Sequence, residues 1–278
     1  MKLIIDDDNC IGCGICASVC IRDNIIIVEG VALETGSNCF ECGHCMAICK
    51  NNAINLKLFK NQEYRIIDHD FKDIPVEYVD LLRLYKQRRS IRWFKNKKID
   101  KLTFDKLFEG AYYSPSAQNE QDVEFVVLDE KTDEFLDLVY DIIKVEEDQF
   151  FRIKEFGEYL KDKSTKKYNP LLWGGKQIIL TFSSDKTSAV IANTRVELLA
   201  YSLGLGGFYS LFLLKADEID HIRLMKFFPQ INPEKHLYSS FIIGYPKIKF
   251  RRTIPHKKLM FRINKVLFSY DRDRKSVV

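Results

Sequence analysis

The sequence lacks a long apolar run, and this absence limits where the protein can work. No stretch approaches the roughly 18 uncharged apolar residues of a membrane helix, so we expect no membrane association. The first eight residues alternate like a strand and then turn acidic, unlike a targeting segment. Hydrophobic residues make up 46% and charged residues 29% of the 278-residue chain. This composition predicts a globular cytoplasmic protein of one large or two ordinary domains.

Cysteine is missing from the last 229 residues, because all eight cysteines lie between Cys10 and Cys49. They form two runs of the spacing Cys-x2-Cys-x2-Cys-x3-Cys, and the second run follows the first by 29 positions. The segment is therefore an internal duplication. Runs of this spacing suit [4Fe–4S] clusters, each of which needs four converging thiolates. Structural zinc leaves the third cysteine of each run unexplained, and disulfides suit a secreted chain with a signal peptide.

The duplicated segment resembles a bacterial-type two-[4Fe–4S] ferredoxin over residues 1–58. In such ferredoxins the fourth cysteine of each run ligates the other cluster. The resemblance therefore implies two ligand sets, namely Cys10, Cys13, Cys16 and Cys49, and Cys39, Cys42, Cys45 and Cys20. Ile21 and Lys50 stand where the ferredoxin pattern has proline. Eight reduced thiolates also indicate a reducing compartment.

Short elements in residues 1–58 predict a small βαββαβ domain. The expected strands include Lys2–Ile5, Ile25–Val28 and Ala53–Leu58, and the expected helices are Gly14–Cys20 and Gly43–Cys49. A domain of about 60 residues is only marginally stable without cross-links such as bound metals or disulfides. We therefore expect the clusters to hold it together and iron removal to unfold it.

Residues 59–79 have mixed charge, and we interpret them as a linker to a second domain, residues 80–278. Strands and helices interleave there, which predicts an α+β fold with a central sheet. The expected helices are 79–86, 102–112, 131–160 and 189–205, and the expected strands are 123–128, 177–182 and 236–244. Asp100 and Thr103 are candidate caps of the second helix, and Gly204 is a candidate end of the last.

A basic segment opens the second domain, since Lys86–Lys98 carries seven basic residues in thirteen. Such a patch can bind nucleic acid, can be a solvated face without a ligand, or can grip a phosphate. We favour the phosphate, because arginine offers a planar fork and Ser90 a hydroxyl. A second basic loop, Lys247–Lys258, follows the last strand, and the two segments together would clamp one phosphate.

Four motifs resemble the nitroreductase (FMN-dependent oxidoreductase) superfamily, in the family's own order. They are Arg88-Arg89-Ser90-Ile91-Arg92-Trp93-Phe94, Ser114-Pro115-Ser116-Ala117-Gln118-Asn119 with Gln121, Leu203-Gly204-Leu205-Gly206-Gly207, and Ile243-Gly244-Tyr245-Pro246. The resemblance covers roughly residues 80–260. It implies a mostly antiparallel sheet flanked by helices and a homodimer with FMN at its interface. It also implies that the C-terminal tail crosses to the partner.

The resemblance also implies FMN contacts at particular positions. The residues expected at the phosphate and ribityl chain are Arg88, Arg89, Ser90 and Arg92. Further charge at the phosphate would come from Arg251 or Arg252, with Lys257 as the alternative. The residues expected to approach the isoalloxazine ring from the partner subunit are Pro115, Ser116, Ala117 and Asn119. The backbone N–H groups expected near flavin N5 and O4 are those of Tyr209, Ser210 and Leu211.

Two departures from the family lie close to the expected substrate face. Of the properties that the resemblance implies, the substrate class is therefore the one that transfers least well to this chain. Asp122-Val123 replaces a Pro-Trp pair, and Tyr209-Ser210-Leu211 replaces a Trp-Ile-Gly type turn. The Gly204–Gly207 stretch follows a helix and lacks the full G-x-G-x-x-G spacing, which argues against a dinucleotide loop. The remaining scattered histidines have no Ser or Cys partner nearby, so we interpret them as structural or surface residues. They are His69, His221, His236 and His256.

The formal charge of +4 does not indicate a nucleic-acid partner. Each oxidised cluster with its four thiolates carries about −2, and the FMN phosphate adds about −2. With both clusters and FMN bound, the chain would then carry a net charge of about −2, which gives no basis for nucleic-acid binding.

We expect the two sites to connect one-electron and two-electron chemistry. An external donor such as ferredoxin or flavodoxin would supply electrons to two [4Fe–4S] clusters, and these would pass them to FMN. A small organic acceptor, such as a nitroaromatic or a quinone, would be reduced there. No catalytic side chain is required, because the chemistry takes place at FMN N5. Two alternatives stay open: a redox sensor or electron-transfer module without an organic substrate, and a nitroreductase fed by NAD(P)H.

Overall fold

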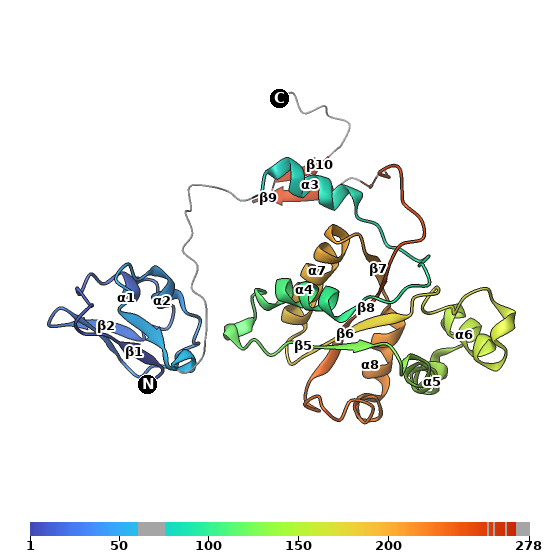
Figure 1. Cartoon of the computed structure of the whole chain (residues 1–278), viewed down its shortest axis with the longest axis horizontal. Helices are drawn as coiled ribbons and strands as arrows, with labels where there is room; N and C mark the ends of the chain where they lie inside the picture. Colours follow the sequence, from blue (N-terminus) through green and yellow to red (C-terminus); the bar gives the residue numbers. More distant parts are fainter. Residues whose placement is uncertain (61–75, 255, 258, 265, 271–278) are drawn as a thin grey trace.

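The computed structural model describes residues 1–60, 76–254, 256–257, 259–264 and 266–270 (Figure 1). Most of the expected linker, residues 61–75, lies outside the described residues, as do His69 and the end of the tail, 271–278. Each of the two regions on either side of residues 61–75 has its own hydrophobic core. Within the described ranges, no helix is both long and apolar enough to cross a membrane.

Two antiparallel strand pairs and two short helices make up the N-terminal region. The elements are β1 (Leu3–Ile5), α1 (Ile15–Ser18), β2 (Ile25–Val28), β3 (Val31–Glu34), α2 (His44–Ile48) and β4 (Ile54–Leu56). β1 pairs with β4, and β2 pairs with β3. Glu34 ties the pairs together, because its carboxylate accepts from the backbone N–H groups of Lys2 and Leu3 and from the Asn24 amide. A short 3-10 helix, η1 (Lys57–Phe59), follows β4.

The 29-residue repeat of the sequence recurs in the backbone. Left-handed φ angles occur in pairs 29 positions apart, at Gly12 (64°) and Glu41 (50°), Gly14 (74°) and Gly43 (75°), and Asp23 (48°) and Asn52 (52°). α1 and α2 also begin 29 positions apart. Gly12 has no room for a side chain, since a Cβ there would lie 2.3 Å from the carbonyl oxygen of Gly30. The two cysteine runs therefore follow nearly the same path.

A four-stranded antiparallel sheet forms the centre of the second region, where the sequence predicts a central sheet and the family resemblance implies a mostly antiparallel one. Its strands are β5 (Glu124–Leu128), β6 (Gln177–Ser183), β7 (Gly206–Tyr209) and β8 (His236–Gly244). They lie in the order β5-β6-β8-β7, and all neighbours are antiparallel. Every residue of β6 is buried, which fits a central strand covered on both faces.

Helices cover both faces of this sheet (Figure 1). One face packs against α4 (Lys101–Tyr112) and α7 (Lys186–Ser202), and the other packs against α5 (Thr132–Ile143), α6 (Phe151–Lys161) and α8 (Leu211–Met225). Alternation along β6 separates the two cores, because Ile178 and Leu180 belong to one and Ile179 to the other. The remaining described helices are α3 (Tyr78–Gln87), η2 (Ala117–Asn119), η3 (Lys144–Glu146) and η4 (Lys163–Thr165). The Asp100 cap of α4 is present, since its carboxylate accepts from Thr103 N at 2.8 Å.

The helix predicted over residues 131–160 is wrong as a single element. It breaks into α5, η3 and α6, and α6 folds back against α5. The rings of Tyr140 and Phe156 meet edge to face at 5.8 Å across this fold, so the break buries aromatic surface. The helix predicted over 189–205 begins earlier than expected, because Asp185 caps it by accepting from Ser188 N.

One α-helix and three strands of the second region have no counterpart among the sequence predictions. They are β7, α8 and the C-terminal hairpin of β9 (Leu259–Ile263) and β10 (Val266–Tyr270). β7 begins with two glycines, and in the sequence glycines at this position predict only the end of the preceding helix. Pairing requires a small residue there, because a Cβ at Gly207 would lie 2.1 Å from the carbonyl oxygen of Ile242. Local propensity therefore did not indicate this edge strand.

Candidate functional site

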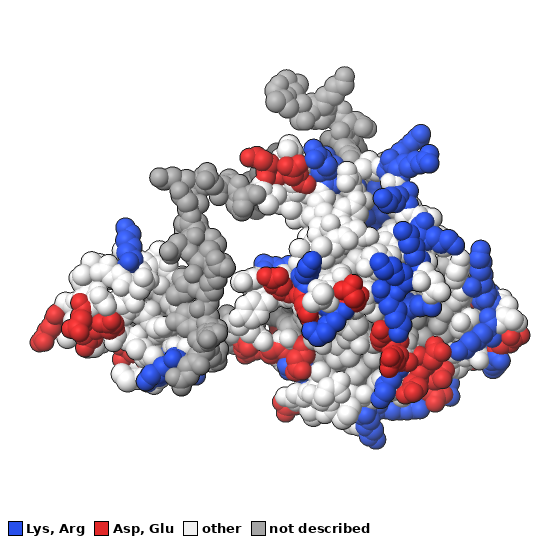
Figure 2. Space-filling view, in the orientation of Figure 1, with Lys and Arg blue, Asp and Glu red and all other residues white. Residues whose placement is uncertain are grey.

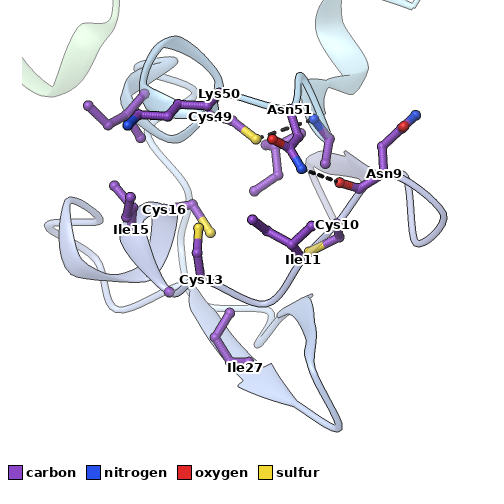
Figure 3. A pocket seen from close by; sticks show the side chains of 14 residues that line it. Asn9, Cys10, Ile11, Cys13, Ile15, Cys16, Ile27, Cys49, Lys50 and Asn51 are labelled. Carbon is purple, nitrogen blue, oxygen red and sulfur yellow. Dashed lines mark hydrogen bonds between the residues drawn. The ribbon is translucent and has the colours of Figure 1, made fainter.

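Four cysteine side chains surround one cavity of about 270 Å³ in the N-terminal region (Figure 3). They are Cys10, Cys13, Cys16 and Cys49, the set that the ferredoxin resemblance implies for one cluster. Most of the other lining side chains are apolar, among them Ile11, Ile15, Ile27, Ile48 and Ile54. The cavity closes at one side where the Asn51 amide donates to the carbonyl of Asn9 at 3.0 Å.

The other four cysteines line a second cavity. They are Cys20, Cys39, Cys42 and Cys45. Each cavity thus takes three thiols from one run and the fourth from the other, so both runs must fold together to form either site. His44, the first residue of α2, lies beside this cavity and is exposed.

Backbone N–H groups point at four of the eight sulfurs. Asn24 N donates to Cys20 Sγ and Ala53 N donates to Cys49 Sγ, both at 3.3 Å. Ala32 N donates to Cys10 Sγ and Glu41 N donates to Cys39 Sγ, both at 3.4 Å. Such bonds stabilise thiolate charge and tune cluster potentials. All eight thiols are free, and burial raises the pKa of Cys45 to about 11. Iron must therefore displace a tightly held proton there, and the donor set fits [4Fe–4S] ligation.

The two basic segments of the second region lie side by side. Lys95 N donates to the carbonyl of Tyr245, and Lys247 N donates to the carbonyl of Trp93, both at 2.8 Å. Ile91 N also donates to the carbonyl of Gly207 in β7 at 2.9 Å. The segment after α3 is thus an extra strand-like layer against β7 and the turn after β8. This contact joins three of the four family motifs, which the sequence spacing alone cannot establish.

Arg88, Glu197 and Tyr209 form a polar network between α3, α7 and β7. Arg88 Nη1 donates to Glu197 Oε1 at 2.9 Å, and the Tyr209 hydroxyl donates to Glu197 Oε2 at 3.2 Å. Burial and the neighbouring Glu197 carboxylate raise the pKa of Tyr209, so this hydroxyl stays protonated. The Arg92 guanidinium lies 5.1 Å from the centre of the Phe208 ring, and Ser90 is exposed.

Arg89 carries a buried donor without a partner. Its Nη1 donates to the carbonyl of Arg88 at 3.2 Å, while its Nη2 is buried and has no hydrogen bond. The side chain lines a hollow of about 460 Å³ together with Lys95, Lys249 and Tyr245. An unpaired buried donor is costly, and an anion in the hollow would satisfy it. The residues present therefore fit the phosphate of FMN.

The turn from β7 into α8 is held by two serines. Ser210 N donates to the carbonyl of Ser240 at 3.1 Å, and the Ser240 hydroxyl donates to the carbonyl of Ser210 at 2.6 Å. Ser210 is buried and its side chain makes no capping bond, so it does not satisfy the first N–H groups of α8, which have no acceptor within the helix. Leu211 opens α8 and is exposed. The resemblance also implies a free donor at Ser210, but that N–H is bonded to Ser240, so the donors at this turn begin with Leu211.

The loop between α4 and β5 carries the remaining motif. Ser116 Oγ accepts from Gln121 N at 2.9 Å, and Ala117 N donates to Ser188 Oγ at 3.2 Å. The Asn119 amide contacts the N-terminal region, where its Nδ2 donates to the carbonyls of Phe40 (3.3 Å) and Glu41 (3.0 Å). These two carbonyls lie between two cysteines of the second cavity. Pro115 is exposed.

Within one chain, the loop and the arginine network lie at different parts of α7. The loop contacts Ser188 in the first turn, whereas Arg88 contacts Glu197 nine residues later. Nine helical residues rise about 14 Å. The structure therefore brings Arg88–Arg92 together with Tyr209 and the turn after β8, and it holds Pro115–Asn119 apart from them.

Arg251 and Arg252 lie on the loop after that turn, and both are exposed, as is Lys257. Lys and Arg side chains gather over this part of the molecule in the space-filling view (Figure 2). Of the basic residues of this loop, Lys249 lines the Arg89 hollow. The sequence alone does not distinguish this lysine from the others of its basic loop.

The sequence predictions give no role to Glu197 and name Asp122 only as a departure from the family. Glu197 is the only acidic residue of α7, which is the one signal that the sequence offers for its role. Asp122, where the family has proline, accepts from Ser184 N at 2.7 Å and from Ser183 Oγ at 2.8 Å. Its backbone carbonyl also accepts from Lys235 Nζ at 2.5 Å. Asp122 therefore fastens the end of the loop to the end of β6.

Comparison with known proteins identifies both regions. Residues 85–245 match the model of the nitroreductase family, and residues 2–50 match that of a 4Fe-4S dicluster domain. No curated protein matches the chain.

Solved structures share the fold of the second region. A BluB-like flavoprotein from Clostridium difficile 630 is 20% identical, with 64% of this chain and 94% of that chain covered and a TM-score of 0.50. A nitroreductase with bound FMN from Bacteroides fragilis is 15% identical, with 66% and 99% covered and a TM-score of 0.50. Another with bound FMN, from Desulfitobacterium hafniense, is 17% identical, with 67% and 96% covered and a TM-score of 0.50. At these identities the likeness shows the fold alone.

Proposed function

This chain belongs to the nitroreductase family, and from that premise we propose that it is an FMN-dependent oxidoreductase fed through its own iron–sulfur domain. Electrons from an external one-electron donor, such as ferredoxin or flavodoxin, pass through two [4Fe–4S] clusters in residues 1–58 to FMN in residues 80–278. A small organic acceptor, such as a nitroaromatic or a quinone, is reduced there. The eight free thiols fit a reducing compartment such as the cytoplasm.

The contact of Asn119 with the second cysteine run carries this proposal. Its amide donates to the carbonyls of Phe40 and Glu41, which lie between Cys39 and Cys42. Asn119 belongs to the loop that the family resemblance assigns to the flavin. Two carbonyls bound by one amide orient the loop against the cavity of Cys20, Cys39, Cys42 and Cys45. We infer that this cluster delivers electrons to the flavin and that the cluster of Cys10, Cys13, Cys16 and Cys49 receives them.

The chain's own residues would bind and orient the cofactor. The groups proposed at the phosphate and ribityl chain are Arg88, Arg89, Ser90 and Arg92, with Arg251 and Arg252 adding charge. Arginine suits this task because its planar fork pairs with two phosphate oxygens. FMN, when bound, supplies the chemistry that joins single-electron input to two-electron output.

The turn at Tyr209, Ser210 and Leu211 would direct the first backbone N–H groups of α8, beginning with that of Leu211, at the flavin ring, because the Ser210 N–H is bonded to Ser240. The protonated Tyr209 hydroxyl, held by Glu197, fixes the start of this turn. The buried Ser210–Ser240 pair fixes its end. Preorganised donors of this kind stabilise negative charge without reorganising during the reaction.

A homodimer would complete the site. Pro115, Ser116, Ala117 and Asn119 lie at the other end of α7 from Arg88, which supports their approaching the flavin of the partner subunit. In such a dimer the Asn119 contact would bring the iron–sulfur domain of one subunit to the flavin held by the arginines of the other.

The Asn119 contact offers a test of the relay. Asn119→Gly removes both donated hydrogen bonds and tolerates the left-handed φ of 59°. The matched control is Gln118→Gly, also at a left-handed φ (49°), whose side chain has no hydrogen bond among the described residues. Two hydrogen bonds contribute about 1–3 kcal/mol together, so flavin reduction by reduced ferredoxin should slow roughly 5- to 150-fold in Asn119→Gly only. Direct reduction by dithionite should be unchanged.

The same experiment separates the alternatives. Equal rates in Asn119→Gly and in the wild type would contradict delivery through this contact. Faster reduction by NADH or NADPH than by reduced ferredoxin would indicate an NAD(P)H-fed nitroreductase. Turnover of nitroaromatics or quinones no faster than with free FMN would indicate a sensor or an electron-transfer module.

A further inference from the structure

Asp217, His221 and His236 gather at the opposite end of the sheet edge from the arginine network. Asp217 lies in α8 and is 6% exposed, His221 follows it by four residues, and His236 opens β8. Asp217 Oδ1 lies 2.8 Å from His221 Nδ1, and Asp217 Oδ2 lies 2.8 Å from His236 Nδ1. One possible ligand atom from each of the three lies within 4.8 Å of the others. Both histidines thus have a shared buried partner, which their sequence positions do not indicate.

The hydrogen bonds of His221 define what lies between it and Asp217. His221 Nε2 is 2.7 Å from the carbonyl of Pro233, which can only accept, so Nε2 carries the proton. In a neutral ring the Nδ1 lone pair would then face a carboxylate oxygen at 2.8 Å. This repulsion is relieved by a proton on either group or by a metal ion bound to both. A backbone carbonyl that holds the far N–H of a histidine is also the usual second partner of a metal-ligating histidine.

The two imidazole rings lie close enough to share one ion. Their centroids are 4.1 Å apart and their planes are 31° from parallel, and both Nδ1 atoms lie on the same buried carboxylate. Two imidazole nitrogens and one carboxylate oxygen are ligands that suit Zn²⁺.

A hollow of about 590 Å³ opens beside the three side chains, which leaves access for a fourth ligand such as water. Its lining includes Lys186, Glu218 and Asp220. α8 departs from helical geometry at Asp220 (φ −147°, ψ 75°), between Asp217 and His221.

We propose that Asp217, His221 and His236 bind one divalent transition-metal ion of the Zn²⁺ type, with a fourth position open to the hollow. Each histidine coordinates as a neutral ring through Nδ1 with its proton on Nε2, and binding involves no change of oxidation state. The ion ties α8 to β8 and to the segment that contains Pro233. It is separate from the iron–sulfur cavities and from the proposed FMN site.

Zinc loading of the full-length protein with its clusters and FMN in place tests this site. The protein is equilibrated with Zn²⁺ and desalted, zinc and iron are counted per chain, and the zinc X-ray absorption edge is measured. The expected result is about one zinc with only N and O ligands at roughly 2.0–2.2 Å, and no sulfur at roughly 2.3 Å. His221→Gln and His236→Gln should each lose the retained zinc. Glu218→Gln, in the same hollow, should keep it.

Three outcomes would overturn the proposal. They are no retained zinc in the wild type, a sulfur-containing shell, and equal retention in the His236→Gln variant. Circular dichroism of each variant, measured before zinc is added, shows whether the fold is intact. If both histidine variants are misfolded, the absorption edge of the wild-type protein decides, since it requires no substitution.

Discussion

Arg89→Met separates cofactor binding from folding. The guanidinium makes one long hydrogen bond of 3.2 Å to a backbone carbonyl, and its Nη2 has no partner. Methionine keeps the apolar stem, so the free energy of unfolding should change by less than about 1 kcal/mol. The same Nη2 would pair with the phosphate in the loaded protein. A hydrogen bond to a charged group contributes about 1.5–3 kcal/mol, which predicts FMN binding weaker by roughly 10- to 150-fold.

Equilibrium dialysis of FMN against the flavin-free full-length protein measures this change. Arg83→Met is the matched control, because Arg83 lies on α3, shortly before Arg89 in the sequence, and among the described residues it pairs only with the exposed Asp80, at 2.9 Å. Its FMN affinity should stay within about threefold of the wild type. An Arg89→Met protein with wild-type affinity would refute the assignment of the phosphate to this hollow. Equal weakening in both variants would show a general loss of positive charge instead.

Three further predictions concern the fold that positions these sites. Anaerobic iron chelation should unfold residues 1–58, whose core includes Cys16 and Cys45, and protease resistance of this region after chelation would contradict this. Gly12→Ala should prevent stable iron loading, because its Cβ would lie 2.3 Å from a carbonyl oxygen. Gly36→Ala, also at a left-handed φ but with nothing within 4 Å, should load iron, and iron and sulfide counts compare the two. Burial raises the pKa of Asp122, but hydrogen bonds from Ser184 and Ser183 outweigh it and hold that pKa below its ordinary 3.8. The stabilisation is therefore present above about pH 4 and is lost as the pH falls through the folded-state pKa. Tryptophan fluorescence, which reports only the second region, should show the stability difference from Asp122→Asn shrinking at low pH, and a constant difference would contradict it.

The cysteine spacing predicts more of the structure than any other feature of the sequence. Its 29-residue repeat recurs in paired left-handed residues and in paired helix starts, because the same ligand geometry requires the same backbone path. The strands β6 and β8 follow directly from apolar runs of buried residues. The start of α4 follows from its Asp100 cap, since capping is local chemistry.

Other features could not be predicted, because they depend on contacts between residues that are distant in sequence. β7 is an edge strand whose glycines read as a helix end, and only its pairing with β8 defines it. The approach of Lys95 to Tyr245 depends on the sheet order, and the role of Glu197 depends on two residues that are distant in sequence. The histidines His221 and His236 look isolated until the fold places both on Asp217.

Anaerobic stopped-flow reduction of the full-length protein tests the proposed relay most directly. Reduced ferredoxin is mixed with the wild type and with a variant whose Cys20, Cys39, Cys42 and Cys45 are replaced by serine, and the absorbance of the oxidised flavin is followed. Loss of rapid flavin reduction in the variant, with dithionite reduction retained, is the predicted result. Flavin reduction as fast in the variant as in the wild type would contradict electron delivery through the clusters.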